Sequence, residues 1–175
     1  MSIRKMSLST QVSFLAMFSV LAFLSSLIVK ATVSYGAIVY AITLLTGTLF
    51  VSRPFSATII SLIAGLLYSL QSHLFLLMLG TFLIRGLVLD IFFIPSGIYE
   101  KAALGRYNIP MITSAMVVSS FSAGLYQYFF LTLFLGKIVD FGAFIVSTIF
   151  LVGLISNAIA GYLVPKLIMP RLRGV

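Results

Sequence analysis

Residues 74–93 read LFLLMLGTFLIRGLVLDIFF, an apolar stretch with only two charged side chains, Arg85 and Asp90. Five similar stretches occupy residues 11–29, 35–50, 54–70, 110–135 and 141–164. Each of the six is about 16–26 residues long, against the roughly 20 residues with which a helix crosses the hydrocarbon core of a bilayer. Backbone groups in lipid must be bonded within the protein, and barrel strands would be about half as long. The pattern therefore predicts an all-α integral membrane bundle of six transmembrane helices.

The composition indicates that lipid is the solvent of this chain. Hydrophobic residues make up 61% of the sequence, charged residues 8%, and the mean hydropathy is +1.22. A soluble domain of 175 residues could not bury so much apolar surface. We therefore expect residues 1–175 to form a single, multi-pass transmembrane domain in the cell membrane.

Short turns join the apolar stretches, with one longer loop at residues 95–109. Pro110 suits the first turn of the helix that follows this loop, where a missing N–H does no harm. Pro165 and Pro170 are expected to end the sixth helix, because proline interrupts helical hydrogen bonding.

Lysine and arginine are distributed unevenly between the two ends of the predicted bundle. If the spans alternate in direction, eight of these cations fall on one side: Arg4, Lys5, Arg53, Lys101, Arg106, Lys166, Arg171 and Arg173. Only Lys30 and Lys137 fall on the other side, and Arg85 lies within a span. This bias follows the positive-inside rule and predicts that the N and C termini are both cytoplasmic. The partner of the excess positive charge is then membrane lipid, and not nucleic acid.

Few side chains of this chain could carry out catalysis. The sequence has one histidine, His73, three acids, Asp90, Glu100 and Asp140, and no cysteine. It contains no His-Glu-x-x-His zinc motif, no Gly-x-Ser-x-Gly elbow and no glycine-rich phosphate loop. Serines are numerous, but none has an evident base. We predict no catalytic residue, no metal site and no cofactor, and no ATP hydrolysis by the chain itself.

The outer half of the predicted bundle gathers polar and aromatic side chains. They are Tyr35, Tyr40, Tyr68, Gln71, His73, Tyr126, Gln127 and Tyr128. Interfacial belts also place tyrosine at this depth, and His73 also fits an exposed loop. Gln127 is harder to explain in that way, because a buried amide about nine residues inside a helix needs partners. An aromatic-lined outer cavity with an amide would suit a small polar organic ligand, so these residues are our candidate substrate site.

Arg85 is the costly residue of the fourth span, since a guanidinium in the membrane costs about 2.5–3.5 kcal/mol or more unless it is paired. Asp90 follows five residues later, about 140° around the helix, so the two are poorly placed to pair. Counted from the inner ends of the helices, Asn157 lies at the depth of Arg85. We expect Arg85 to meet Asn157, backbone carbonyls or a partner protein. A structural role for Arg85 and Asp90 and a direct ligand contact both remain open, and Asn157 is a further candidate contact.

Small residues recur along one face of the first span: Ala16, Ser19, Ala22 and Ser26. They fall within an arc of about 120°. Small side chains allow another helix to approach closely, which promotes helix association in lipid. This face either packs within the bundle or docks a partner membrane protein.

Two local motifs, RPFSAT at residues 53–58 and RGLVLD at residues 85–90, resemble motifs of the substrate-binding S components of energy-coupling factor (ECF) vitamin transporters. Residues 53–58, RPFSAT, resemble the Arg/Lys-Pro-Gly-Ala-Ala stretch that opens helix three in many members. Residues 85–90, RGLVLD, resemble the Gln-Gly-Leu-Gly-Ala-Glu stretch of the hydroxymethylpyrimidine/thiamin branch, with Arg85 in place of the glutamine. That branch tends to carry acids in helix three, where this chain has Ser61, Leu62 and Tyr68. A cationic thiazolium would favour such acids, and a neutral or weakly acidic nutrient fits equally well.

The resemblance implies a role in nutrient import. An S component captures a vitamin in an outward cavity, with the loop between helices one and two (residues 29–37) as a lid. It associates with a transmembrane coupling protein and two cytosolic ATPases, and topples in the bilayer to release the solute. The small-residue face of the first helix is then the expected docking face. A stand-alone secondary transporter or channel is the alternative, and an intramembrane enzyme or an assembly scaffold is the third possibility.

Overall fold

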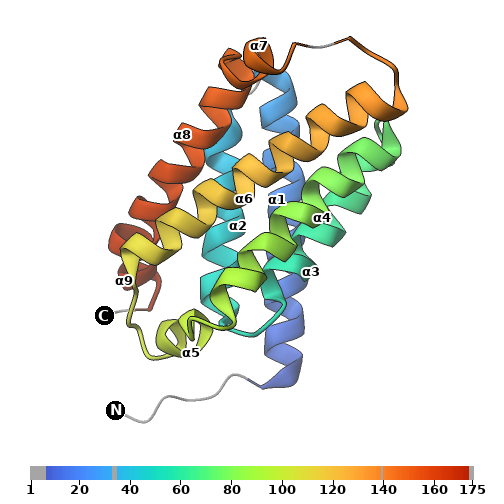
Figure 1. Ribbon diagram of the computed structural model, residues 1–175. Helices are drawn as coiled ribbons and strands as arrows, with labels where there is room; N and C mark the ends of the chain where they lie inside the picture. Colours follow the sequence, from blue (N-terminus) through green and yellow to red (C-terminus); the bar gives the residue numbers. More distant parts are fainter. Residues whose placement is uncertain (1–6, 33–34, 139, 174–175) are drawn as a thin grey trace.

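The computed structural model describes residues 7–32, 35–138 and 140–173, and every regular element within these ranges is helical (Figure 1). The elements are α1 (Leu8–Ala31), α2 (Ala37–Val51), α3 (Ser56–Ser69), α4 (Phe75–Phe93), α5 (Ile98–Ala103), α6 (Ile109–Phe129), the π-helical turn η1 (Phe130–Phe134), α7 (Phe141–Ile145), α8 (Thr148–Leu163), the π-helical turn η2 (Val164–Ile168) and α9 (Met169–Arg173). Arg4 and Lys5 of the charge pattern, and Val33 and Ser34 of the expected lid, lie outside the described residues.

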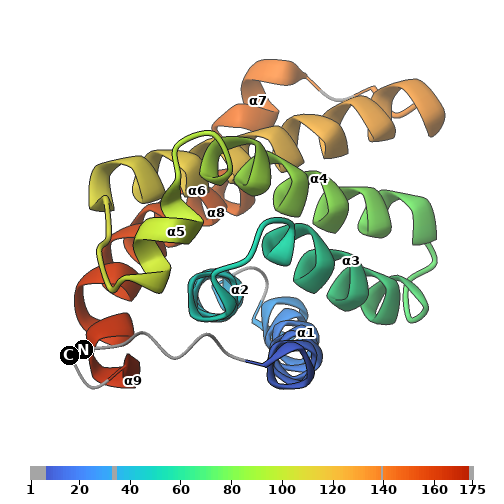
Figure 2. The same cartoon turned by 90° about the horizontal axis from the view of Figure 1, so that it is seen from below.

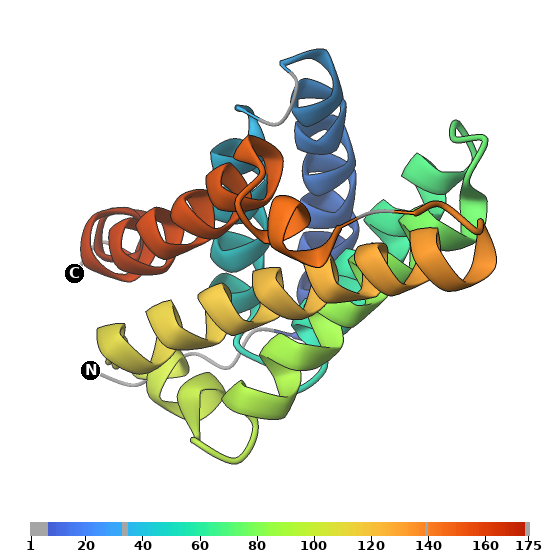
Figure 3. The ribbon, with the colours of Figure 1, turned by 45° about the horizontal axis from the view of Figure 1, so that its top comes forward.

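The six longer helices form a closed circuit in which each contacts the next. The order around the circuit is α1, α3, α4, α6, α8 and α2, and α2 returns to α1. Seen from below, α2 stands next to α1 and α3 (Figure 2), and with the top turned forward α6 runs between α4 and α8 (Figure 3). The start of α1, the short α5 and α9 lie at the lower end of the bundle in Figure 1, and α7 lies at the upper end.

Four of the helical segments are long and apolar enough to cross a membrane. They are Leu8–Ala31, Phe75–Phe93, Ile109–Phe134 and Thr148–Leu172. The 15 residues of α2 and the 14 residues of α3 are apolar but shorter. At 1.5 Å per residue these two helices span only about 21–23 Å. Large apolar side chains cover the outside of the bundle, where Leu24 is 48% exposed and Ile91 66% exposed, as expected of surfaces that face lipid.

The sixth apolar stretch was predicted to form one helix that ends at Pro165, and the structure differs from this prediction at both ends. It is divided near its start, where the Ser147 hydroxyl accepts a hydrogen bond from Phe150 N and so begins a new helix, α8. The chain then continues through η2 to Arg173. Pro165 is the second residue of η2. Proline has no N–H to donate to the preceding turn, and here the chain winds as a π-helix and continues without ending the helix.

The predicted loop at residues 95–109 contains a helix that the sequence analysis missed. Gly97 adopts a left-handed conformation (φ 64°) before α5 begins at Ile98. Ile98, Tyr99 and Ala102 are buried in the apolar core, so α5 closes the lower end of the bundle. Six residues are too few to hold a helix by propensity, and α5 therefore depends on this packing.

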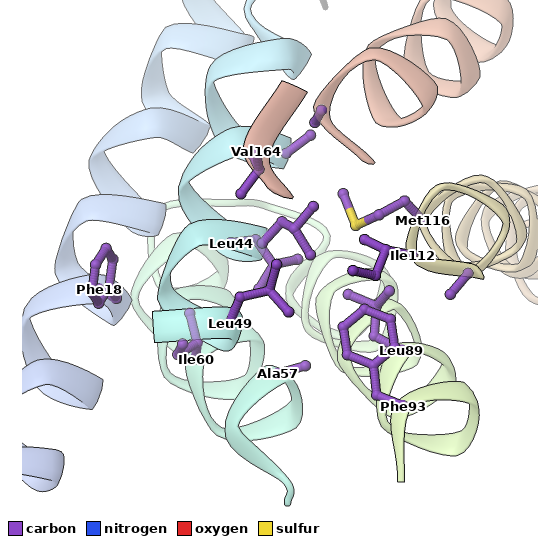
Figure 4. Packing of buried hydrophobic residues seen from close by; sticks show 14 of the residues in the cluster. Phe18, Leu44, Leu49, Ala57, Ile60, Leu89, Phe93, Ile112, Met116 and Val164 are labelled. Atoms are coloured by element: carbon purple, nitrogen blue, oxygen red, sulfur yellow. The ribbon is translucent and has the colours of Figure 1, made fainter. Parts of the chain in front are cut away.

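The lower half of the bundle is filled by apolar side chains from every long helix. Figure 4 shows Leu44 and Leu49 of α2 facing Leu89, Phe93, Ile112 and Met116 of α4 and α6. These side chains are fully buried. The apolar cluster therefore occupies the lower half of the bundle, whereas the opposite half contains a cavity.

Candidate ligand-binding cavity

The upper half of the bundle encloses a cavity of about 710 Å³. Its walls come from the last turns of α1, the first turn of α2, the end of α3, the first half of α4, the second half of α6, and α7 with the start of α8. Protein sites for small organic molecules have volumes of about 300–1,000 Å³, so this cavity can hold a molecule of vitamin size.

Aromatic rings line much of the cavity. Tyr40, Tyr68 and Phe82 lie on one side, with ring centroids 5.3 Å apart for Tyr40 and Phe82 and 5.5 Å apart for Tyr68 and Phe82. Phe144 and Phe150 form a second pair at 5.4 Å. Such walls bind the flat or apolar body of a ligand and exclude water.

A polar group at the base of the cavity joins α4, α6 and α8. Arg85 Nη2 donates to Ser120 Oγ at 3.2 Å, and Asn157 Nδ2 donates to the same oxygen at 3.2 Å. Asn157 Nδ2 also donates to the Gly153 carbonyl at 2.7 Å. The Tyr40 ring lies beside the guanidinium, 5.2 Å from Arg85 Cζ to the ring centroid. Arg85 therefore meets Asn157 through the shared serine hydroxyl.

Asp90 takes no part in this group. Its carboxylate accepts hydrogen bonds from Thr58 N, Thr58 Oγ1 and the Tyr99 hydroxyl at the lower end of the bundle. Burial and the adjacent carboxylate raise the pKa of Tyr99, so this phenol keeps its proton. Arg85 and Asp90 thus have different partners, as their separation around α4 predicts.

The structure places Tyr40, Tyr68 and Gln127 in the wall of the cavity. Gln127 Nε2 donates to Thr81 Oγ1 at 3.3 Å across the α4–α6 contact. Gln71 and His73 line a smaller adjoining hollow of about 310 Å³, which shares Tyr68 with the main cavity.

The other candidates for the substrate site are not among the residues that line the main cavity. Tyr35 is 68% exposed at the start of α2. The Tyr126 hydroxyl donates to the Leu76 carbonyl at 3.0 Å, and its ring occupies the space above Gly80 in the α4–α6 contact. Tyr128 packs on Phe141 and Phe144. Asn157 is fully buried behind Ser120.

Several lining residues were missed by the sequence analysis. Phe82, Ser120, Phe144 and Phe150 line the cavity, as does Ser26, which was predicted for docking. In the sequence these residues look like ordinary membrane-helix residues, because phenylalanine and serine occur on every face of such helices. Gly124 is a residue that could have indicated this lining, because its missing side chain leaves room for the Phe150 ring. A single sequence, however, does not reveal that contact.

Most of the small-residue face of α1 packs inside the bundle. Ser19 and Ala22 are fully buried and Ser26 is 3% exposed, whereas Ala16 is exposed. The neighbours of α1 are α2 and α3. Intramolecular packing therefore accounts for three of the four residues.

Fold and cavity together define an all-helical bundle with membrane-spanning helices and a solute-sized cavity at one end. The chain has the fold of a solved structure described as "Crystal structure of an S-component of ECF transporter", with a TM-score of 0.57 and 17% sequence identity. The similarity covers 94% of this chain and 82% of the other. No family model and no curated protein matches the sequence.

Proposed function

We propose that this chain is the membrane-embedded substrate-capture subunit, the S component, of an ATP-driven ECF-type importer for a vitamin or related micronutrient. The observation that carries the proposal is the cavity of about 710 Å³ within a bundle that has the S-component fold. The cavity lies in one half of the bundle and the apolar core fills the other half. This arrangement suits capture from one side of the membrane and is unlike a channel.

The topology proposed with this function has six spans, with both termini in the cytoplasm of a cell-membrane protein. The short α2 and α3 would then lie in a thinned or locally hydrated region, since hydrophobic mismatch of this size is tolerated at modest cost. The cavity would open outward, because it lies at the end of the bundle opposite α5 and α9. The partners would be a transmembrane coupling protein and two cytosolic ATPases.

The charge of the cavity lining indicates which class of nutrient the cavity would favour. Its charged lining residues among those described are Lys30 and Arg85, both cations. A cationic thiazolium would be repelled by such a lining, so the charge of the cavity argues against thiamin itself.

Native mass spectrometry of the purified protein tests capture directly. We expect a co-purifying molecule of vitamin size, and a protein that binds nothing would contradict the proposal. In proteoliposomes with the coupling protein and ATPases, uptake should require ATP hydrolysis. Uptake by the chain alone would instead favour the secondary-transporter alternative.

Gln127 offers a test of the site. Gln127→Leu keeps the volume of the side chain and removes the amide, while Thr81 retains its bond to the Leu77 carbonyl. We expect a loss of affinity of about fivefold to tenfold for the co-purifying molecule, the size typical of one neutral hydrogen bond. An unchanged affinity would remove Gln127 from the site.

A further inference from the structure

The base of the cavity holds hydrogen-bond donors that the described part of the protein does not satisfy. Arg85 Nε is buried and has no hydrogen-bond partner among the described residues. The guanidinium has five N–H donors; Nη2 is bonded to Ser120 Oγ at 3.2 Å, and the Tyr40 hydroxyl also lies close to the guanidinium, which leaves Nε without an acceptor. A buried donor without a partner is costly, and more so when it is charged.

Ser120 provides a second donor at the same place. Its oxygen accepts from Arg85 Nη2 and from Asn157 Nδ2, so its own proton is directed elsewhere. The neighbouring Ser119 directs its hydroxyl to the Met116 carbonyl, whereas no such bond is found for Ser120 within the described residues. The Asn157 amide cannot be turned to accept this proton, because the Gly153 carbonyl at 2.7 Å requires the nitrogen.

No acidic side chain among the described residues is available to neutralise Arg85. The sequence contains three acids. Asp90 is bonded to Thr58 and Tyr99, Glu100 is exposed on α5, and Asp140 caps α7 through Ala143 N at 2.7 Å. None of them is among the described residues that line the cavity. An arginine in a membrane bundle is expected to have a counter-charge, and here residues 7–32, 35–138 and 140–173 do not supply it.

We infer that the base of the cavity binds a carboxylate, and that the captured solute is an organic acid with an apolar or aromatic body. The carboxylate would accept from Arg85 Nε–H, from a free Arg85 Nη–H and from the Ser120 hydroxyl. Its body would lie between Tyr40, Phe82 and Phe150. This inference rests on the proposed capture function and names the class of its substrate.

Charge and depth both favour a carboxylate over a phosphate. A phosphate ester carries a charge of about −1.5 to −2, more than one guanidinium neutralises. Arg85 lies ten residues after Phe75, the first residue of α4, which is about 15 Å along the helix. The other lining cation, Lys30, is in the last turn of α1, near the mouth. A monoanion at the base therefore matches the single cation there.

The first experiment divides candidate solutes by charge. Full-length protein in nanodiscs, freed of any co-purified solute, is incubated with the small molecules of yeast extract after separation by anion exchange into an anionic and a non-anionic fraction. We expect native mass spectrometry to detect a bound mass from the anionic fraction, identified as a carboxylic acid. A bound neutral, cationic or phosphorylated compound would overturn the inference and leave the capture function intact. Binding from neither fraction would overturn the capture function and the inference with it.

The second experiment tests the role of Arg85. The acid found above and its methyl ester are compared on the parent protein and on Arg85→Gln. We expect the ester to bind the parent at least about tenfold more weakly than the acid, and Arg85→Gln to lose affinity for the acid by a similar factor. Affinity for the ester should change little in the variant. If Arg85 serves only as a structural anchor, acid and ester will lose affinity equally, and the inference is wrong.

Two further variants support this comparison. Arg106→Gln removes an exposed cation from the loop before α6, outside the cavity, and should leave both affinities unchanged. If Arg85→Gln does not fold, Ser120→Ala removes only a hydroxyl, and should reduce the affinity for the acid about threefold to tenfold. An unchanged acid affinity in Ser120→Ala would contradict the proposed contact.

Discussion

Asp90 in α4 accepts two hydrogen bonds from Thr58 in the first turn of α3, one from the backbone N–H at 2.8 Å and one from the hydroxyl at 2.5 Å. Its other oxygen accepts from the Tyr99 hydroxyl of α5. The carboxylate is 2% exposed. Three donors and the positive end of the α3 dipole compensate its charge. One side chain therefore holds together the lower ends of α3, α4 and α5.

Replacement of Asp90 by alanine should destabilise the protein clearly. Asp90→Ala leaves the part-buried N–H of Thr58 and the buried hydroxyl of Tyr99 without this acceptor, at a cost of up to about 1–3 kcal/mol for each such group. We expect a lower melting temperature in detergent, measured by circular dichroism because the chain has no tryptophan. Asp140→Ala is the control, since Asp140 caps only the short, exposed α7. A loss no greater than that of Asp140→Ala would contradict the role assigned to Asp90.

Tyr99 should make stability sensitive to alkaline pH. Its pKa in the folded protein is raised above the ordinary value of 10.0 by burial and by the Asp90 carboxylate. The folded state therefore keeps a proton that the unfolded chain releases, and the stabilisation is fully present below pH 10 and declines as the pH rises above it. Between pH 9 and pH 11, the parent protein should lose more stability than Tyr99→Phe, as followed by thermal unfolding. Equal losses for both proteins would exclude this linkage.

Gly86 is a position of close approach between α4 and the backbone of α3. A Cβ added at Gly86 would lie 2.7 Å from the Ala57 carbonyl oxygen and from Thr58 Cα, atoms that cannot move independently. We expect Gly86→Ala to lower the free energy of unfolding by about 1–3 kcal/mol, as overpacking usually does. Gly153→Ala is the matched change on α8, because its Cβ would meet Ser120 Oγ at an ordinary 3.7 Å. Similar melting temperatures for the two variants would contradict this reading of the α3–α4 contact.

The docking hypothesis for α1 can be tested at two positions with different burial. Ala22 is fully buried, so Ala22→Leu should overpack the bundle and lower the melting temperature of the subunit itself. Ala16 is exposed, so Ala16→Leu should leave stability unchanged. If the exposed face of α1 docks the coupling protein, Ala16→Leu will reduce complex formation in a co-purification assay. Ala31→Leu, also exposed on α1, serves as the control, and equal recovery of the complex with both variants would remove Ala16 from the docking face.

The sequence predicted the helical class of this protein and singled out several of its polar residues. Arg85 and Asp90 were separated by simple helical geometry, and they do have different partners. Gln127 was singled out because an amide deep in an apolar helix needs a partner, and it lines the cavity. These inferences were possible because charged and amide groups are rare and costly in such a chain, so each one carries information.

Other features could not be predicted in this way. The sequence did not indicate whether the small-residue face of α1 packs within the bundle or is left for a partner protein, because small residues allow close helix packing in both cases. The break at Ser147 and the helix α5 depend on local capping and on packing against distant segments. The sequence also did not indicate that the helix continues past Pro165, because the π-helical turn that contains this proline is not predicted by local sequence rules.

By itself the sequence determined that this chain is an apolar helical bundle with few ionisable groups, because composition and segment length follow directly from the solvent. Only the tertiary structure decided that Arg85 and Ser120 meet at the base of a cavity and that Asp90 lies outside it. The rotation of each helix about its axis sets those contacts, and that rotation results from the packing of six helices against one another.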